Sequence, residues 1–264
     1  SLSFQTNLFT KKDLTTRLQK GGALLSDMRQ MVLFWSDDMM NTDPIPRLAR
    51  TLPKTTVARV KDTFTRAFRP RFIMGSPPNA WQLAQALENL NCDVQIIRLF
   101  YFWITARAEK PLYEFVSDVV YMRARSIEKE IRIEEACGWL TQRLNAAGKS
   151  WTPTVIKKVA RGLLAALRDF GILEGTVRKR VAAVNLPVET FALIAFCLHG
   201  LGIGGREMVE HPDWRLFLLN EIGSEHLFLE CHQHGWLIFE SVGNICRIEF
   251  PEVPFKEYAH GVIG

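Results

Sequence analysis

The sequence lacks paired cysteines and a long apolar run, and both absences narrow the class of protein. Its five cysteines are widely spaced and include no C-x-x-C pair, so they resemble neither a disulfide framework nor a zinc finger. The longest apolar stretch, Phe191 to Ile203, contains His199 and glycine and is shorter than the ~18–20 residues that span a bilayer. No apolar run follows the polar and basic start, so we see no secretory signal. We expect a cytoplasmic protein without a membrane partner.

Catalytic and cofactor-binding motifs are also missing. The chain contains no G-x-S-x-G, H-E-x-x-H or P-loop, and the glycine-rich stretch 200–205 follows an apolar helical pattern instead of a strand. Cys231, His232 and His234, with His226 nearby, are residue types that zinc prefers, but their spacing does not bring the imidazoles to one side of a helix. We therefore predict a protein that is not an enzyme and that holds no metal or cofactor.

Charge is distributed unevenly along the chain. Residues 1–185 carry 29 Lys and Arg against 17 Asp and Glu, a net +12, and residues 186–264 carry 4 against 11, a net −7, which together give the net +5 of the chain. This asymmetry suggests that the first part meets a polyanion. It also suggests a basic helical region, 1–185, and an acidic C-terminal region, 186–264. The length of 264 residues fits two domains or one compact unit.

Apolar residues recur mostly with helical spacing, which predicts an all-α, predominantly helical fold. Residues 94–108 predict an aromatic core helix, and residues 187–201, apolar on nearly all sides, predict a buried helix. A period of two appears only near the end, where 236–241 and 245–250 flank Gly243-Asn244 and predict a small C-terminal β-hairpin. Further helices are predicted over 10–35 with a break at Gly21-Gly22, and over 47–50, 81–91, 111–122, 126–147, 213–222 and 224–234.

Two more predicted helices, 53–68 and 153–170, each combine an apolar face with a cationic face. A proline suits the first turn of each helix, and Arg69-Pro70 is expected to end the first. Each follows another helix after a short turn, which is the order of a helix-turn-helix. We therefore predict two helix-turn-helix-like segments, at about 41–70 and 130–172.

Both segments are rich in cations. Residues 47–71 contain eight basic residues and one acid, and residues 149–180 contain eight basic residues and two acids. In a helix-turn-helix the second helix enters the major groove, while cations and hydroxyls meet phosphates. We therefore predict binding to double-stranded DNA. The candidate contact residues are Lys54, Thr55, Arg59, Lys61, Arg66 and Arg69 in the first segment, and Lys149, Thr154, Lys157, Lys158, Arg161, Arg168, Arg178, Lys179 and Arg180 in the second.

Other interpretations of these features stay open. A cationic helix face is also typical of a solvated surface, or of an adaptor that docks acidic partners within a multi-subunit complex. An RNA-binding helical protein is a further alternative, and Phe100 to Trp103 could stack on unpaired bases. Four consecutive aromatic residues are, however, more typical of a helix core. The acidic end, with its hairpin and Trp236, could dock a partner protein.

Three stretches resemble the BrxA family of BREX bacteriophage-exclusion systems. They are RTLPKTTVARVKDTFTRAFRPRF at 50–72, LFYFWITARAEKPLYEFVSDVVY at 99–121 and WTPTVIKKVARGLLAALRDFGIL at 151–173. The resemblance implies a nearly all-helical, non-catalytic protein of bacterial phage defence that binds double-stranded DNA. It also implies that the protein functions together with a DNA methyltransferase, a phosphatase-like protein and ATPases.

Overall fold

The chain divides into two compact units, each built from two separate segments. The computed structural model describes residues 10–52 and 55–264. Unit 1 consists of the segment that ends at Ala23 together with Glu109–Ala183, and unit 2 consists of Leu24–Ala108 and Val184–Gly264. Both units are mostly helical with small antiparallel sheets, so the predicted fold class is confirmed. The change of charge after residue 185 lies close to the last junction between the units, but the basic region contributes residues to both.

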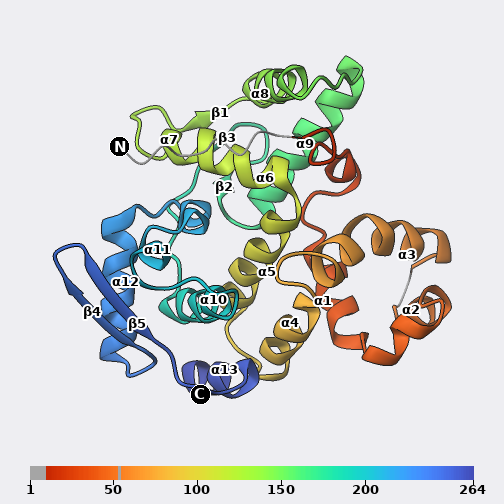
Figure 1. Ribbon diagram of the computed structural model, residues 1–264. Helices are drawn as coiled ribbons and strands as arrows, with labels where there is room; N and C mark the ends of the chain where they lie inside the picture. Colours follow the sequence, from red (N-terminus) through yellow and green to blue (C-terminus); the bar gives the residue numbers. More distant parts are fainter. Residues whose placement is uncertain (1–9, 53–54) are drawn as a thin grey trace. The chain divides into compact units, whose positions relative to one another are not determined.

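Unit 1 combines helices with a three-stranded sheet (Figure 1). The central strand of this sheet pairs antiparallel with both of its neighbours, so that Arg180 lies opposite Glu130 on one side and Glu174 on the other. The elements are η1 (Arg17–Lys20), α6 (Lys110–Phe115), the π-helical turn η4 (Val116–Val120), α7 (Tyr121–Arg123), β1 (Glu130–Ile131), α8 (Ile133–Ala146), α9 (Pro153–Asp169), β2 (Leu173–Glu174) and β3 (Lys179–Val181).

The helix predicted over 126–147 is wrong at its start. Helix α8 begins only at Ile133, after β1, and Arg132 caps it by donating its backbone N–H to Glu135 Oε2 at 3.1 Å. The preceding residues are extended because a strand about fifty residues later pairs with them. The backbone N–H of Val181 donates to the carbonyl oxygen of Lys129 at 2.9 Å. Tertiary pairing has therefore overridden the local helical pattern.

Helix α9 begins and ends where its sequence predicts. The hydroxyl of Thr152 accepts the backbone N–H of Val155 at 3.3 Å, a cap of the kind that contributes about 1 kcal/mol. Pro153 occupies the first turn, where no intrahelical N–H bond is lost. Gly171 follows the helix with φ +80°, a conformation that favours glycine. These local signals explain why the prediction of 153–170 is confirmed to within one residue.

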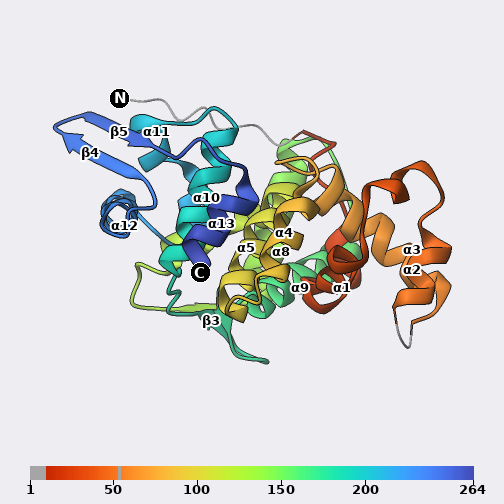
Figure 2. The ribbon, with the colours of Figure 1, turned by 90° about the horizontal axis from the view of Figure 1, so that it is seen from below.

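In unit 2, α4, α5, α10 and α13 pack around one another (Figure 2). The predicted core helix, buried helix and C-terminal hairpin are all confirmed, and the last helix is an addition. The elements are α1 (Leu25–Phe34), η2 (Asp37–Asn41), α2 (Ile45–Thr51), α3 (Val57–Thr63), the π-helical η3 (Phe64–Ile73), α4 (Ala80–Asn89), α5 (Val94–Ala108), α10 (Val188–Gly200), α11 (Gly205–Val209), η5 (Pro212–Phe217), α12 (Glu221–Gln233), β4 (Ile238–Val242), β5 (Ile245–Glu249) and α13 (Phe255–Ile263).

The first basic helix differs from its prediction at both ends. It begins at Val57, capped by the hydroxyl of Thr56, and Pro53 and Lys54 lie outside the described residues. It continues past Pro70 as η3 because the wider π-turn tolerates the missing proline N–H. The backbone N–H of Met74 donates to the carbonyl oxygen of Arg69, five residues earlier, at 2.9 Å. The expectation that Arg69-Pro70 ends the helix is therefore wrong.

The predicted helix over 10–35 is interrupted more strongly than expected. Only η1 and α1 are helical, and Gly21 and Gly22 between them have φ values of +154° and +60°. The predicted helices 213–222 and 224–234 are replaced by η5 and α12, which are separated by Leu218 at φ +61°. Across the described part of the chain, no helix is both long enough and apolar enough to cross a membrane.

Candidate nucleic-acid interface

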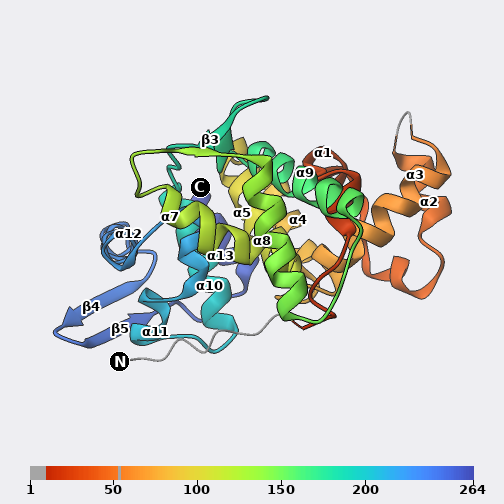
Figure 3. The same cartoon turned by 90° about the horizontal axis from the view of Figure 1, so that it is seen from above.

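Helices α8 and α9 and the hairpin that follows them form a continuous substructure of unit 1. Residues 147–152 connect the two helices, which pack against each other (Figure 3). Strand β1 precedes α8, and β2 and β3 follow α9 as a hairpin whose tip, residues 175–178, projects outward in Figures 2 and 3. Along the chain the order is therefore strand β1, helices α8 and α9, and the β2–β3 hairpin. Strand β1 completes the sheet by pairing with β3.

One face of α9 is exposed and cationic. Thr154, Lys157, Lys158 and Arg161 are exposed on this side, and Val159, Leu163 and Leu167 on the opposite side are buried. Arg168 lies near the end of the same face, half-buried, with its Nη2 2.9 Å from Asp169 Oδ1. Within residues 10–52 and 55–264, no carboxylate forms an ion pair with Lys157, Lys158 or Arg161. We call Thr154, Lys157, Lys158, Arg161 and Arg168 the cationic face of α9.

Cys137 on α8 lies within the electrostatic reach of this face. Partial burial and the negative charge of Glu134 raise the pKa of the Cys137 thiol above its ordinary value. Lys157 and Arg161 act in the opposite direction because their positive charges favour the thiolate. The net rise keeps the thiol protonated at neutral pH. Cys137 therefore adds no negative charge beside the cationic face.

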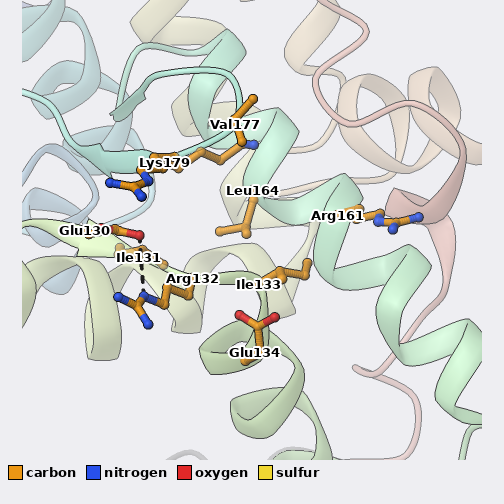
Figure 4. A pocket seen from close by; sticks show the side chains of 10 residues that line it. Glu130, Ile131, Arg132, Ile133, Glu134, Arg161, Leu164, Val177 and Lys179 are labelled. Carbon is orange, nitrogen blue, oxygen red and sulfur yellow. Dashed lines mark ion pairs between the residues drawn. The ribbon is translucent and has the colours of Figure 1, made fainter.

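A cavity of about 480 Å³, the hairpin groove, lies along one side of α9 (Figure 4). Its walls come from β1, the first residues of α8, α9 and the hairpin tip. In Figure 4 the Arg161 side chain points away from Leu164 and Ile133, toward the outside of the groove. The lining is mixed in charge, with Arg132, Arg161, Arg178 and Lys179 against Glu130 and Glu134. Glu130 is partly neutralised by Arg132, whose Nε lies 3.4 Å from its Oε1.

The three cations predicted in the hairpin have different surroundings. Arg178 is exposed at the tip beside Val177, whose exposed fraction is 93%. Lys179 Nζ donates to the carbonyl oxygen of Thr176 at 2.9 Å. Arg180 Nε lies 3.4 Å from Oε1 of Glu174 on the neighbouring strand. Of the three, Arg178 is therefore the most available for a ligand.

Glycine is required at the start of the hairpin turn. Gly175 has φ +91°, and a Cβ at this position would lie 2.0 Å from the carbonyl oxygen of Arg178. The cations of this hairpin were predicted as contacts but the hairpin itself was not, because strands of two and three residues are too short to show a period of two. One signal in the sequence did indicate a turn here, namely Glu174-Gly175 between the apolar residues Leu173 and Val181.

A second cavity, the η1 groove, has a volume of about 740 Å³ and lies between α9 and the end of η1. Its lining includes Lys20, Lys158, Arg161 and Arg168, and its acid, Asp169, is paired with Arg168. The two segments meet closely because α9 has no side chain at Gly162. A Cβ there would lie 1.8 Å from the carbonyl oxygen of Leu18. Gly22 approaches α9 in the same way, since its Cβ would lie 3.0 Å from Ala166 N.

Lys149, a predicted DNA contact, is placed differently from the cationic face. Its Nζ donates to the carbonyl oxygens of Leu14 and Lys11, at 2.7 and 3.1 Å. Asp13, between these residues, accepts hydrogen bonds from Thr10 and Lys110. Burial raises the pKa of Asp13, but these hydrogen bonds lower it more, so its pKa lies below the ordinary value. Lys149 therefore joins the two chain segments of unit 1 to each other.

In unit 2, the first predicted segment contains α2, α3 and η3, and α2 packs against α3. Two of its predicted contacts are paired with acids. Arg59 Nη2 lies 3.1 Å from Asp27 Oδ2, and Arg66 Nε lies 2.7 Å from Asp62 Oδ1. Thr55 is half-buried, and Lys61 and Arg69 are exposed. Arg71, another cation of this stretch, is only 1% exposed. Lys54 lies outside the described residues.

The aromatic run on α5 and the histidines at the end of α12 both make contacts within unit 2. Phe100, Tyr101, Phe102 and Trp103 are all at most 1% exposed in the core of unit 2, so bases cannot stack on them. His232 Nδ1 accepts the backbone N–H of Phe239 at 3.2 Å, while His234 stacks on Trp236 at 4.3 Å between ring centroids. Among the residues that the structure describes, no group of three His, Cys, Asp or Glu is arranged to hold a metal ion.

Comparison with known proteins gives one match. No curated protein and no solved structure matches this chain significantly. The sequence model of the BrxA family matches residues 12–196, which include α9, the hairpin and the basic helix of unit 2. This is more than half of the 264 residues. The chain therefore belongs to the BrxA family and is a BREX-associated phage-defence protein.

Proposed function

We propose that this chain is a non-catalytic subunit of a BREX system that binds double-stranded DNA in the cytoplasm through unit 1. The observation that carries the proposal is the cationic face of α9, where Lys157, Lys158 and Arg161 are exposed and form no ion pair with a described acid. Unneutralised cations on a rigid helix attract phosphates and release the counterions that surround them. Such a surface is better explained by binding to a polyanion than by simple contact with solvent.

The surroundings of α9 favour duplex DNA as that polyanion. Helix α8 packs against α9, as the first helix of a helix-turn-helix packs against the second, and the β2–β3 hairpin that follows α9 would serve as a wing beside the DNA. An α-helix with its side chains is about 10–12 Å wide, and the major groove of B-DNA is about 12 Å wide. Thr154 and Lys157, near the N-terminus of α9, would enter first.

RNA fits this arrangement less well. The major groove of an A-form duplex is deep and narrow and does not admit a helix. Single-stranded RNA is usually held by exposed aromatic side chains, and Phe100 to Trp103 are buried. We therefore expect duplex DNA to bind more tightly than duplex RNA of the same length.

A second role, docking of partner proteins, is favoured by the C-terminal hairpin of unit 2. Val242 and Ile245 lie opposite each other on β4 and β5 and are 79% and 76% exposed. An exposed apolar pair of this kind fits a protein partner better than DNA. We propose that unit 2 contacts other BREX components, among them the methyltransferase, the phosphatase-like protein and the ATPases, while unit 1 contacts DNA.

The first experiment is a mobility-shift titration of the full chain with duplex DNA over a salt series. Wild-type binding should fall steeply with salt, by about 10³-fold between 50 and 200 mM if six or more phosphates are contacted. Reversal of three charges, Lys157→Glu, Lys158→Glu and Arg161→Glu, should abolish binding at moderate salt. It should also reduce the slope of log K against log salt by about 2.7.

The control is Lys256→Glu, an exposed lysine on α13 of the acidic region. It should leave the binding curve unchanged. Absent or salt-insensitive binding by the wild-type chain contradicts the proposal. If the triple variant binds DNA normally but no longer assembles with partner proteins, the adaptor interpretation replaces it.

A further inference from the structure

We infer that unit 1 grips the duplex from both sides of α9, and that the η1 groove holds the phosphate backbone of one strand, with Lys20 as a contact residue. The inference rests on the proposed function and goes further, because it adds η1 to the predicted contact residues. The structural observation behind it is that grooves lie on both sides of the same exposed helix.

The positions along α9 show how the grooves flank the helix. At ~100° per residue, Leu164 and Ala165 lie on opposite sides of Arg161. Leu164 lines the hairpin groove and Ala165 lines the η1 groove, whereas Arg161 lines both. Arg161 therefore stands on the ridge between the two cavities.

The charge of the η1 groove suits a phosphate. It is lined by four cations, two of which, Lys158 and Arg161, form no ion pair with a described acid. Its acid, Asp169, is paired with Arg168 and so repels an anion only weakly. The hairpin groove has the same number of cations but two acids. By charge, the η1 groove is therefore the more favourable of the two sites for a phosphate backbone.

The dimensions of DNA place a backbone on each side of the inserted helix. A helix about 10–12 Å wide nearly fills a major groove about 12 Å wide, so the protein surfaces beside the helix face the two phosphate backbones. On one side of α9 stands the hairpin with Arg178, and on the other stands η1 with Lys20. The phosphate backbone of one strand would then contact the hairpin, and that of the other strand would contact η1.

The wall formed by η1 is held firmly enough to act in this way. Gly162 and Gly22 let two backbone segments approach each other without intervening side chains. Lys149 and the Asp13–Lys110 ion pair hold the residues just before η1. Lys20 is therefore carried on a braced segment, which reduces the entropy lost when it binds a phosphate.

The test compares Lys20→Glu with Lys12→Glu in the full chain. Both variants reverse one exposed lysine of the N-terminal segment, but Lys12 lines neither groove. Lys20→Glu should weaken duplex binding about tenfold, as expected for loss of one charge-assisted contact, and should reduce the salt slope by about 0.9. Lys20→Gln should show part of this loss, Lys20→Arg should bind like the wild type, and Lys12→Glu should change little. Circular dichroism should show that each variant is folded.

Three outcomes would overturn the inference. If the wild type binds DNA, the α9 triple variant does not, and Lys20→Glu and Lys20→Gln bind like the wild type, then η1 is outside the interface while the proposed function stands. If the wild type itself fails to bind duplex DNA, both the proposed function and the inference fail. An equal loss in Lys12→Glu and Lys20→Glu would indicate a general charge effect and would also overturn it.

Discussion

The two basic helices, α9 in unit 1 and α3–η3 in unit 2, are similar in sequence but differ in how their cations are partnered. Lys157, Lys158 and Arg161 on α9 are exposed and form no ion pair with a described acid. On α3–η3, Arg59 and Arg66 are paired with Asp27 and Asp62, and only Lys61 and Arg69 are exposed without an ion pair to a described acid. Cations that already hold carboxylates have less net charge to offer a phosphate. Basic residues in a sequence therefore need to be weighed with the acids that lie near them in space, and by this measure α9 is the better candidate for the proposed interface.

The sharpest way to break this comparison is to neutralise two matched pairs of cations. Lys157→Gln with Arg161→Gln should weaken duplex binding about 100-fold, because two charge-assisted contacts are lost. Arg59→Gln with Arg66→Gln should change it by less than about threefold, because both arginines are already paired with carboxylates, and loss of such exposed ion pairs should disturb the fold little. Dissociation constants at one low salt concentration measure both effects. An equal loss from the two pairs would show that both helices bind DNA.

A smaller effect is expected from the hairpin that flanks α9. Gly175→Ala should disturb the turn, since φ is +91° and the new Cβ would lie 2.0 Å from the carbonyl oxygen of Arg178. We expect a loss of about 1–3 kcal/mol in local stability and about tenfold weaker DNA binding, with α9 itself intact. Gly243→Ala is the matched control, because Gly243 turns the β4–β5 hairpin at φ +59° with open space around it. Thermal unfolding measures the strain in each variant, and mobility shifts measure its DNA binding. If the two variants bind DNA equally well, the β2–β3 hairpin is not part of the interface.

The smallest effect should come from releasing a paired arginine in unit 2. Asp62→Asn removes the acid 2.7 Å from Arg66 and should raise duplex affinity about two- to threefold. Glu252→Gln, at an exposed acid of the C-terminal region, removes the same charge without releasing an arginine and should have no effect. Fluorescence anisotropy with labelled duplex resolves changes of this size. A decrease in affinity on Asp62→Asn would contradict the idea that pairing weakens this helix as an interface.

The parts that sequence could predict are those with strong local signals. Helix α5 is found over the predicted 94–108 because its apolar pattern is long, and α9 is bounded by Thr152, Pro153 and Gly171. The small sheet of unit 1 could not be predicted because β1 pairs with a strand about fifty residues later. The extension of η3 past Pro70 depends on a π-turn, which no periodicity of 3.6 indicates.

The candidate site was predictable to a similar degree. The cationic face of α9 followed from helical phasing alone. The Asp62–Arg66 pair could also have been foreseen, since it joins residues four apart on one helix. The partners of Arg59 and Lys149 could not, because Asp27 is 32 residues from Arg59 and the carbonyl groups that Lys149 contacts are 135 and 138 residues away. The η1 groove, which Lys20 lines, could not be foreseen for the same reason, since it joins η1 to a helix more than 130 residues later.

The division of unit 1 into two chain segments affects how the protein folds during translation and how its fragments behave. During translation at about 5–20 residues per second, η1 leaves the ribosome on the order of ten seconds before α9 can receive it. Closing so large a loop makes the docking of η1 a late event in folding. A fragment that begins at Glu109 would contain α8, α9 and the hairpin but would expose the seam at Gly162 and Ala166 to water. We expect such a fragment to aggregate, and one that also supplies residues 10–23, covalently or as a second peptide, to stay monomeric.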